Sequence, residues 1–201
     1  MDTTRDRIIA AAVKLFYAQG IRDVSVDAVA ANAGVTKRTF YYHFRSKDDL
    51  IAAYLERRDQ PNLAYFMRWF AETEGSVAAK VEGIFRNLAR SARSAKWKGC
   101  GYLRTTAELV NMPGHPAMKA AAAHKKKVED WLRTTFETAH LADAAQLARQ
   151  VMLLLDGSFA VVLLHRDAAY MEAAGAAAAT LIETAGKKHR SAAARGQSRA
   201  R

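Results

Sequence analysis

The chain has 201 residues, half of them hydrophobic, and carries a formal net charge of +11. This length allows one or two domains with a sizeable core, and the excess of Lys and Arg favours a polyanionic partner. The single cysteine, Cys100, excludes an internal disulfide framework and fits a reducing cytosol.

No membrane role is expected. The N-terminus is polar, which does not fit a signal peptide. The longest apolar stretch, residues 151–164, is interrupted by Asp156, Gly157 and Ser158 and is too short to span a bilayer. We therefore predict a cytoplasmic protein.

The composition predicts an all-α protein, because alanine is abundant, only three prolines occur and no alternating strand-like run persists.

The first three expected helices lie in the N-terminal part of the chain. One is expected over residues 4–19. Ser25 is a good N-cap for a second helix, and Gly34 can end it in a positive-φ conformation. Thr36 can then cap a third helix.

The third helix combines an apolar face with a polar one. Phe40 and Phe44 lie four residues apart and are expected in the core. Residues 32–47 contain four Lys or Arg and no Asp or Glu. Such a helix suits the DNA major groove, where its first residues reach base edges and later ones reach phosphates. A merely basic surface helix is the alternative, because helix-turn-helix patterns are degenerate.

The stretch from Arg7 to Leu50 resembles the DNA-binding domain of the TetR/AcrR family of bacterial transcriptional regulators. The visible departure is Phe40, where the family more often has leucine. The matching runs are Ile8-Ile9-Ala10-Ala11, Leu15-Phe16, Gly20, Val24-Ser25-Val26, Val29-Ala30, Ala33-Gly34-Val35-Thr36, Thr39-Phe40-Tyr41-Tyr42-His43-Phe44 and Ser46-Lys47-Asp48-Asp49-Leu50.

The resemblance implies two sets of DNA contacts. Base or groove contacts are implied for Thr36, Lys37, Arg38 and Thr39. Phosphate contacts are implied for Ser25, Tyr41, Tyr42, His43 and Lys47.

The remaining sequence predicts further helices. A fourth begins at Ser46 and continues past Arg58, with Pro61 expected to kink or break it. Breaks are expected at residues 74–76, 96–101 and 111–116. The other expected helices are 77–88, 103–110, 116–139, 143–165 and 167–185.

These elements suggest three parts. Residues 1–50 form the three-helix DNA-binding domain, and residues 51–186 form a larger helical domain. Residues 187–201 hold six Lys or Arg and no acid, and their composition predicts a disordered tail. This tail either adds salt-sensitive affinity for DNA or only increases solubility.

No catalytic motif stands out in the larger domain, so we expect neither an enzyme nor a cofactor. The resemblance implies that this domain binds a small effector in an apolar cavity and dimerises through its last two helices. Each aromatic candidate alone is more often plain core. The candidate ligand-binding residues are Phe66, Phe70, Phe85, Tyr102, Glu108, His124, Trp131 and Asp156.

A metal site and a redox-active cysteine are two further alternatives. Glu108, His115, His124 and Asp156 have side chains that suit zinc, but they are scattered without short ligand spacing, so no metal is predicted. Three of these four residues, Glu108, His115 and His124, leave an enzyme as an alternative. Cys100 is expected to be a small buried hydrophobe, and a redox role through nearby lysines is the alternative.

Residues 143–185 also favour a dimer on physical grounds. The segments 151–155 and 159–164 are apolar nearly all round their helix, which indicates complete burial or an interface. The alanine-rich segment 168–181 would allow a close approach of helices. An ordinary intramolecular helix pair is the alternative.

Together these features predict a homodimeric repressor that binds a palindromic operator on duplex DNA and leaves it when an effector binds. The alternatives are an activator, a regulator without a ligand, or a small-molecule-binding protein with a vestigial DNA-binding head.

Overall fold

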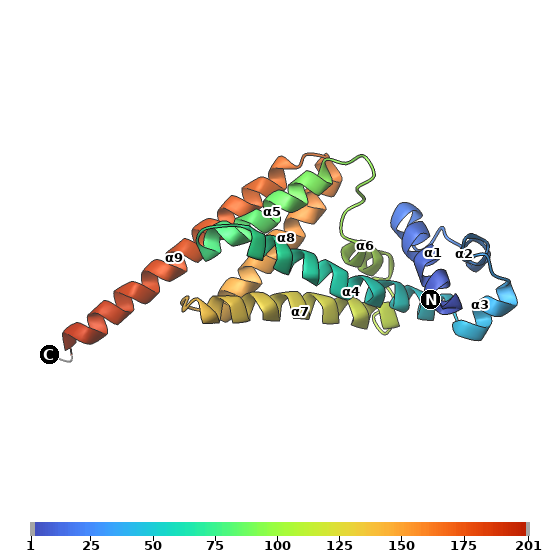
Figure 1. The fold of residues 1–201 in the computed structure, drawn as a ribbon, viewed down its shortest axis with the longest axis horizontal. Helices are drawn as coiled ribbons and strands as arrows, with labels where there is room; N and C mark the ends of the chain where they lie inside the picture. Colours follow the sequence, from blue (N-terminus) through green and yellow to red (C-terminus); the bar gives the residue numbers. More distant parts are fainter. Residues whose placement is uncertain (1–2, 200–201) are drawn as a thin grey trace. The chain divides into compact units, whose positions relative to one another are not determined.

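A computed structural model describes the backbone of residues 3–199 and the side chains of residues 3–187. That part of the chain contains nine helices and no strand, which confirms the all-α prediction (Figure 1). The helices are α1 (Thr4–Gln19), α2 (Val26–Ala33), α3 (Lys37–His43), α4 (Lys47–Glu72), α5 (Val77–Ala92), α6 (Gly101–Glu108), α7 (Pro116–Thr138), α8 (Ala144–His165) and α9 (Ala169–Arg199).

The described residues form two compact units. The first comprises residues 3–62 and 100–125, and the second comprises residues 63–99 and 126–199. This grouping differs from the expected division at residue 50, because α6 and the start of α7 belong with the N-terminal helices. The periodicity of a sequence shows which face of a helix is apolar, but it does not show which distant helix covers that face.

One continuous core holds the first unit together. Phe16 of α1 meets Tyr54 of α4 edge to face, with ring centroids 5.5 Å apart. Tyr102 of α6 is buried in the same cluster, and its hydroxyl donates a hydrogen bond to the Leu55 carbonyl at 3.0 Å. Burial raises the pKa of Tyr102, so its hydroxyl stays protonated and keeps this bond. The core thus joins α6 to α1 and α4.

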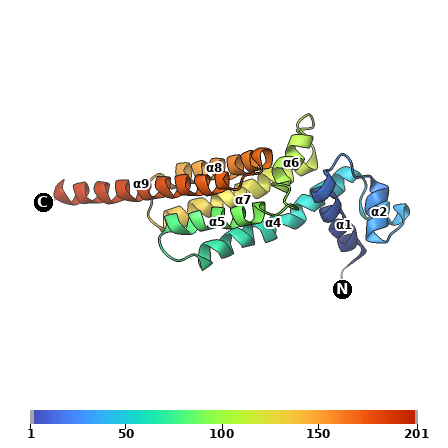
Figure 2. The ribbon, with the colours of Figure 1, turned by 90° about the horizontal axis from the view of Figure 1, so that it is seen from above.

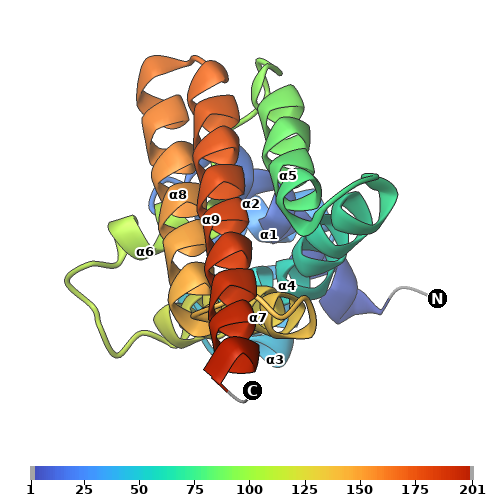
Figure 3. The same cartoon turned by 90° about the vertical axis from the view of Figure 1, so that its left-hand side faces the viewer.

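In the second unit, α9 lies between α5 and α8 (Figures 2 and 3). Gly175 lies where α9 crosses α5, and a Cβ atom built there would be 2.7 Å from the Cβ of Phe85. Glycine is therefore required for the observed approach of the two helices. Close packing against α5 thus accounts for the glycine within the small-residue segment of α9.

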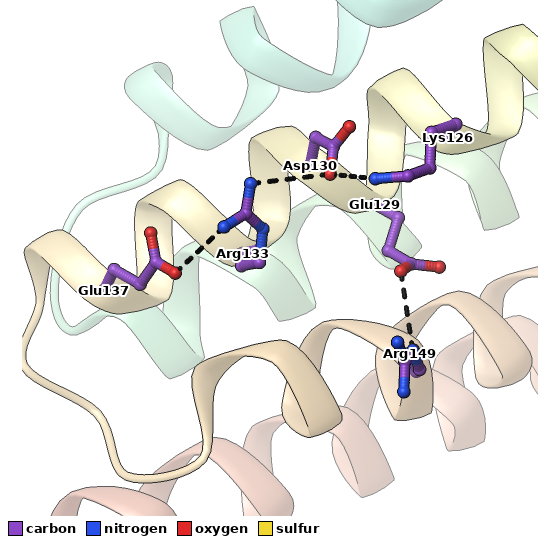
Figure 4. Close-up of polar contacts among 6 residues, drawn as sticks. All are labelled: Lys126, Glu129, Asp130, Arg133, Glu137 and Arg149. Carbon is purple, nitrogen blue, oxygen red and sulfur yellow. Dashed lines mark hydrogen bonds and ion pairs between the residues drawn. The ribbon is translucent and has the colours of Figure 1, made fainter.

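Ion pairs follow the exposed side of α7, and one of them reaches α8 (Figure 4). Glu129 and Arg149 join the two helices at 3.7 Å, whereas the other pairs lie within α7. The pKa of Asp130 is lowered chiefly by a hydrogen bond from Lys126. Solvated pairs of this kind contribute little to stability, so they orient side chains on the surface and do not determine the fold.

Most of the expected helix boundaries agree with the structure within a few residues. Pro61 is an exception, since it lies inside α4 and does not end it. The C-terminus also differs, because α9 continues to Arg199 through most of the segment expected to be disordered. Ala, Lys and Arg have high helix propensity, which can extend a helix without a core beneath it. Residues 200–201 of the predicted tail lie outside the described residues.

Replacing Gly175 by alanine tests the close approach of α5 and α9. Alanine favours a helix by about 1 kcal/mol over glycine. The clash with Phe85, however, should cost about 1–3 kcal/mol, as overpacking typically does. We expect a net loss of stability in urea unfolding, while the exposed control Glu183→Ala changes it little. Greater stability of Gly175→Ala would show that the two helices separate easily.

Candidate nucleic-acid interface

The geometry of the turn between α2 and α3 depends on a few local hydrogen bonds. The Ser25 hydroxyl accepts a bond from the Ala28 amide at 3.1 Å and caps α2. Gly34 then takes the left-handed conformation, with φ 65° and ψ 40°. The Thr36 hydroxyl accepts a bond from the Thr39 amide at 3.1 Å and caps α3. All three residues adopt the conformations that the sequence predicts.

α3 is anchored by its apolar face. Phe40 is fully buried and Phe44 nearly so, with their rings 5.7 Å apart. A helix of seven residues is not stable alone, so this packing must hold it in place. The Arg7 guanidinium of α1 adds bonds to the carbonyls of Ala33 and Gly34, at 2.8 and 3.0 Å. The sequence gives no signal for this contact, which spans more than 25 residues.

The opposite face of α3 is open to solvent. Tyr42 is 85% exposed and Tyr41 is 48% exposed, although both are aromatic. None of the nine predicted DNA-contacting residues is buried. Exposed positions are Ser25, Thr36, Lys37, Arg38, Tyr41 and Tyr42, and partly buried positions are Thr39, His43 and Lys47.

Two of the lysines that are predicted to contact DNA have partners within the protein. Lys37 forms an exposed ion pair with Asp27 at 3.1 Å, which is a weak interaction in water. The Lys47 ammonium donates to the Arg22 carbonyl at 3.3 Å, and its partial burial lowers its pKa. Lys47 therefore has to leave the Arg22 carbonyl, or share its protons, to contact a phosphate.

α6 is bonded to the connection between α1 and α2. The carboxylate of Glu108 accepts hydrogen bonds from the amides of Ile21 and Arg22, at 3.1 and 3.0 Å. The Arg22 guanidinium in turn donates to the Glu108 carbonyl at 2.6 Å. Glu108 is a ligand-binding candidate by the sequence, whereas in the structure its carboxylate is bonded to the loop before α2. No local pattern reveals a contact between residues that lie 86 and 87 positions apart.

Tyr102 and His124, two further candidates for ligand binding, lie in the core of the first unit. Their rings are stacked, with centroids 3.9 Å apart and planes 7° apart. His124 Nδ1 lies 2.8 Å from a carboxylate oxygen of Asp59. Stacking and this polar contact account for both side chains without a ligand.

The other candidates belong to the second unit, where they do not form one group. Phe85 is buried against Gly175 and serves the helix packing described above. Phe66 lies beside Trp69, with ring centroids 6.1 Å apart, and Asp156 is half-buried on α8. Phe70 and Trp131 do come together, edge to face at 5.7 Å.

Phe70 and Trp131 line a pocket of about 460 Å³ within the second unit. The Lys80 ammonium lies over the Phe70 ring at 5.4 Å from its centroid. The complete lining is Phe70, Gly75, Val77, Lys80, Trp131, Thr134, Thr135, Thr138 and Ala139.

The residues considered for a metal have other contacts. His115 Nδ1 accepts a hydrogen bond from the Ala117 amide at 3.0 Å, and its Nε2 lies 3.3 Å from Asp48. Among the described residues, no three metal-ligating side chains lie together. Cys100 is half-buried, and the Lys125 ammonium lies 3.9 Å from its sulfur.

Comparisons with known proteins agree with this geometry. Residues 8–54 match the family described as "Bacterial regulatory proteins, tetR family". The HTH-type transcriptional regulator SrpR of Pseudomonas putida is 43% identical over 60 residues, which are 30% of this chain and 28% of SrpR. The match thus spans less than a third of that relative.

Solved structures extend the similarity over most of the chain. A TetR-family transcriptional regulator from Streptomyces coelicolor is 28% identical and has a TM-score of 0.77. The alignment covers 90% of this chain and 95% of that one. A TetR-type regulator from Streptomyces avermitilis, also 28% identical, has a TM-score of 0.76 over 92% and 98% of the two chains. Residues 8–54 therefore carry the DNA-binding domain of the tetR family of bacterial regulatory proteins, and the fold of the chain is similar to that of TetR-family transcriptional regulators.

Proposed function

We propose that this protein regulates transcription by inserting α3 into the major groove of a specific DNA site. The observation that carries the proposal is the two-sided character of α3. Phe40 and Phe44 fix one side in the core, while Lys37, Arg38 and Tyr42 occupy the solvent-exposed side. A short helix held rigidly with donors and a cation outward has the form needed to read base edges.

Two groups of residues make different contacts in this proposal. Thr36, Lys37, Arg38 and Thr39, in and before the first turn of α3, face the base edges. The second group contacts phosphates and fixes the register of the head on DNA. It consists of Ser25, Tyr41, Tyr42, His43 and Lys47.

Ser25 can contact a phosphate although it also caps α2. Its hydroxyl oxygen accepts a bond from the Ala28 amide, and its proton is still available for a phosphate oxygen. Capping of α2 and contact with DNA are therefore compatible.

We further propose that the protein is a homodimer that uses α8 and α9. Leu153, Gly157, Ala160 and Leu164 recur at helical spacing on α8, and all four are exposed. Leu153 and Leu164 are 74% and 76% exposed, so a second copy would bury substantial apolar surface. By length and composition α8 would also meet the requirements for crossing a membrane, as buried helices of soluble proteins often do. A symmetric dimer would present two copies of α3 to a palindromic operator.

We also propose that a small effector regulates the binding of DNA. The protein acts in the cytoplasm, as a repressor and not as an enzyme. A small effector binds the second unit and favours a dimer geometry in which the two α3 helices no longer fit their half-sites. Such release requires that the effector bind the DNA-free state more tightly than the DNA-bound state.

Arg38→Ala tests groove reading directly. A binding site is first selected from a pool of random duplexes, and affinities are then measured on that site and on unrelated DNA. Loss of one bidentate base contact costs about 1–3 kcal/mol, so we expect specific binding to weaken by about 5- to 150-fold. The control Lys14→Ala removes an equal charge from an exposed position on α1 and should leave specificity intact. Equal losses in both variants would overturn the assignment of Arg38.

Leu153→Glu tests the dimer surface. A carboxylate in the centre of an apolar interface is costly, so we expect sedimentation to show dissociation into monomers. Met67→Glu introduces the same charge at another exposed apolar position and should remain dimeric. A stable dimer of Leu153→Glu would exclude α8 from the interface.

Glu108→Ala tests whether α6 fixes the loop before α2. Bonds to a charged acceptor are worth about 1.5–3 kcal/mol, and both are lost together. We expect faster hydrogen exchange at the amides of Ile21 and Arg22 and weaker binding to the selected DNA. Glu137→Ala, which loses only an ion pair to Arg133 on its own helix, is the control. If exchange at these two amides does not change, the Glu108 contacts do not order the loop.

A further inference from the structure

We propose that the pocket between Phe70, Lys80 and Trp131 binds a flat aromatic carboxylate that carries a hydrogen-bond donor on its ring system. This inference rests on the proposed function, because it names the chemical class of the effector. The pocket belongs wholly to the second unit and is formed by the ends of α4 and α7, the start of α5 and the loop before α5.

The walls of the pocket favour a flat apolar body. Phe70 and Trp131 are half-buried and stand nearly perpendicular, at 85°, so each leaves part of its ring open to the pocket. Aromatic rings prefer edge-to-face or offset contacts, and two perpendicular rings offer a third ring one contact of each kind. The volume of about 460 Å³ lies in the usual range for small-molecule sites. A ligand of two fused rings is the size that such a space accommodates.

The charge of the pocket favours an anion. Lys80 is half-buried and is the only charged residue among those that line the pocket. No ion pair of Lys80 with an acidic residue is found within residues 3–187. Its ammonium lies over the face of Phe70, an interaction with a neutral ring that does not compensate its charge. A carboxylate beside Phe70 would provide that compensation, and a cationic ligand would be repelled.

The threonines of α7 favour a hydrogen-bond donor as the second polar group of the ligand. The Thr135 hydroxyl donates to the Trp131 carbonyl at 2.8 Å, and the Thr138 hydroxyl donates to the Thr134 carbonyl at 2.9 Å. Because each hydroxyl proton is used inside the helix, the oxygens are left as acceptors. They therefore match a donor, such as a phenolic O–H, at the end of the ligand away from the carboxylate.

Three probes separate these contributions: 2-naphthoate, its neutral isostere 2-naphthamide, and 6-hydroxy-2-naphthoate. Isothermal titration with the full chain should show 2-naphthoate binding about tenfold more tightly than the amide, the gain of one charge-assisted contact. The 6-hydroxy compound should bind more tightly still. Equal affinity for 2-naphthoate and 2-naphthamide would overturn the proposal.

Variants assign the binding to this pocket. Lys80→Met should remove the preference for the anion and leave 2-naphthamide binding unchanged, while Trp131→Ala should weaken all three probes. Lys119→Met, an exposed lysine on α7 outside the pocket, should behave as the unmodified chain. Lys80→Gln and thermal melting of each variant exclude unfolding as the cause. Retention of anion preference in Lys80→Met would contradict the assignment of Lys80.

The ligand assignment and the proposed regulation can fail separately. Titration is done without DNA, and release is measured on the selected DNA site with the same probes. Lys80-dependent binding that leaves DNA affinity unchanged would keep the ligand class and contradict the effector role. Absence of binding by all three probes would contradict the ligand class. That result would not bear on the proposed DNA recognition, because the DNA affinities of Arg38→Ala test it independently.

Discussion

The burial of Phe40 and Phe44 is the interaction on which the proposed function depends. α3 has seven residues, fewer than an isolated helix needs to persist in water. Its position is therefore set by what lies beneath it and at its ends. The two phenylalanines supply the apolar anchor, and Thr36 and Gly34 fix the start of the helix. Only with that side fixed can the exposed side meet DNA in one orientation.

The same constraint explains why the first unit contains more than the three N-terminal helices. A head of about 45 residues buries little apolar surface and is marginal by itself. α6 enlarges its core through Tyr102, and Glu108 bonds the loop that leads into α2. Segments 86 and 87 residues apart in the chain thus support the one small surface that we propose reads DNA. A change that displaces α6 would act on the loop before α2 through the hydrogen bonds of Glu108 with Ile21 and Arg22.

Features set by neighbouring residues could be predicted from the sequence. The caps Ser25 and Thr36, the left-handed Gly34 and the buried pair in α3 each follow from local chemistry within a few positions. The open face of α3 follows from the same helical period. Family resemblance then gives a role to each exposed residue, which periodicity alone does not.

Features set by distant residues could not be predicted. The contacts of Arg7 with the turn and of Glu108 with Arg22 join positions that no local pattern relates. Glu108 and Phe85 suit a ligand site by residue type, yet the structure uses one for a loop and the other for helix packing. Conversely, Lys80 has an ordinary place in an amphipathic helix, and only the fold places it over Phe70. Which side chains line a pocket in the second unit therefore depends on tertiary packing.

The most direct test of the central claim maps where the protein touches the selected DNA. Methylation of guanine N7 modifies the major groove, whereas methylation of adenine N3 modifies the minor groove. If two α3 helices read a palindrome, N7 methylation should block binding at two symmetric clusters separated by roughly one or more helical turns of about 10 base pairs. Interference confined to adenine N3, or to a single unpaired cluster, would contradict major-groove reading by a dimer.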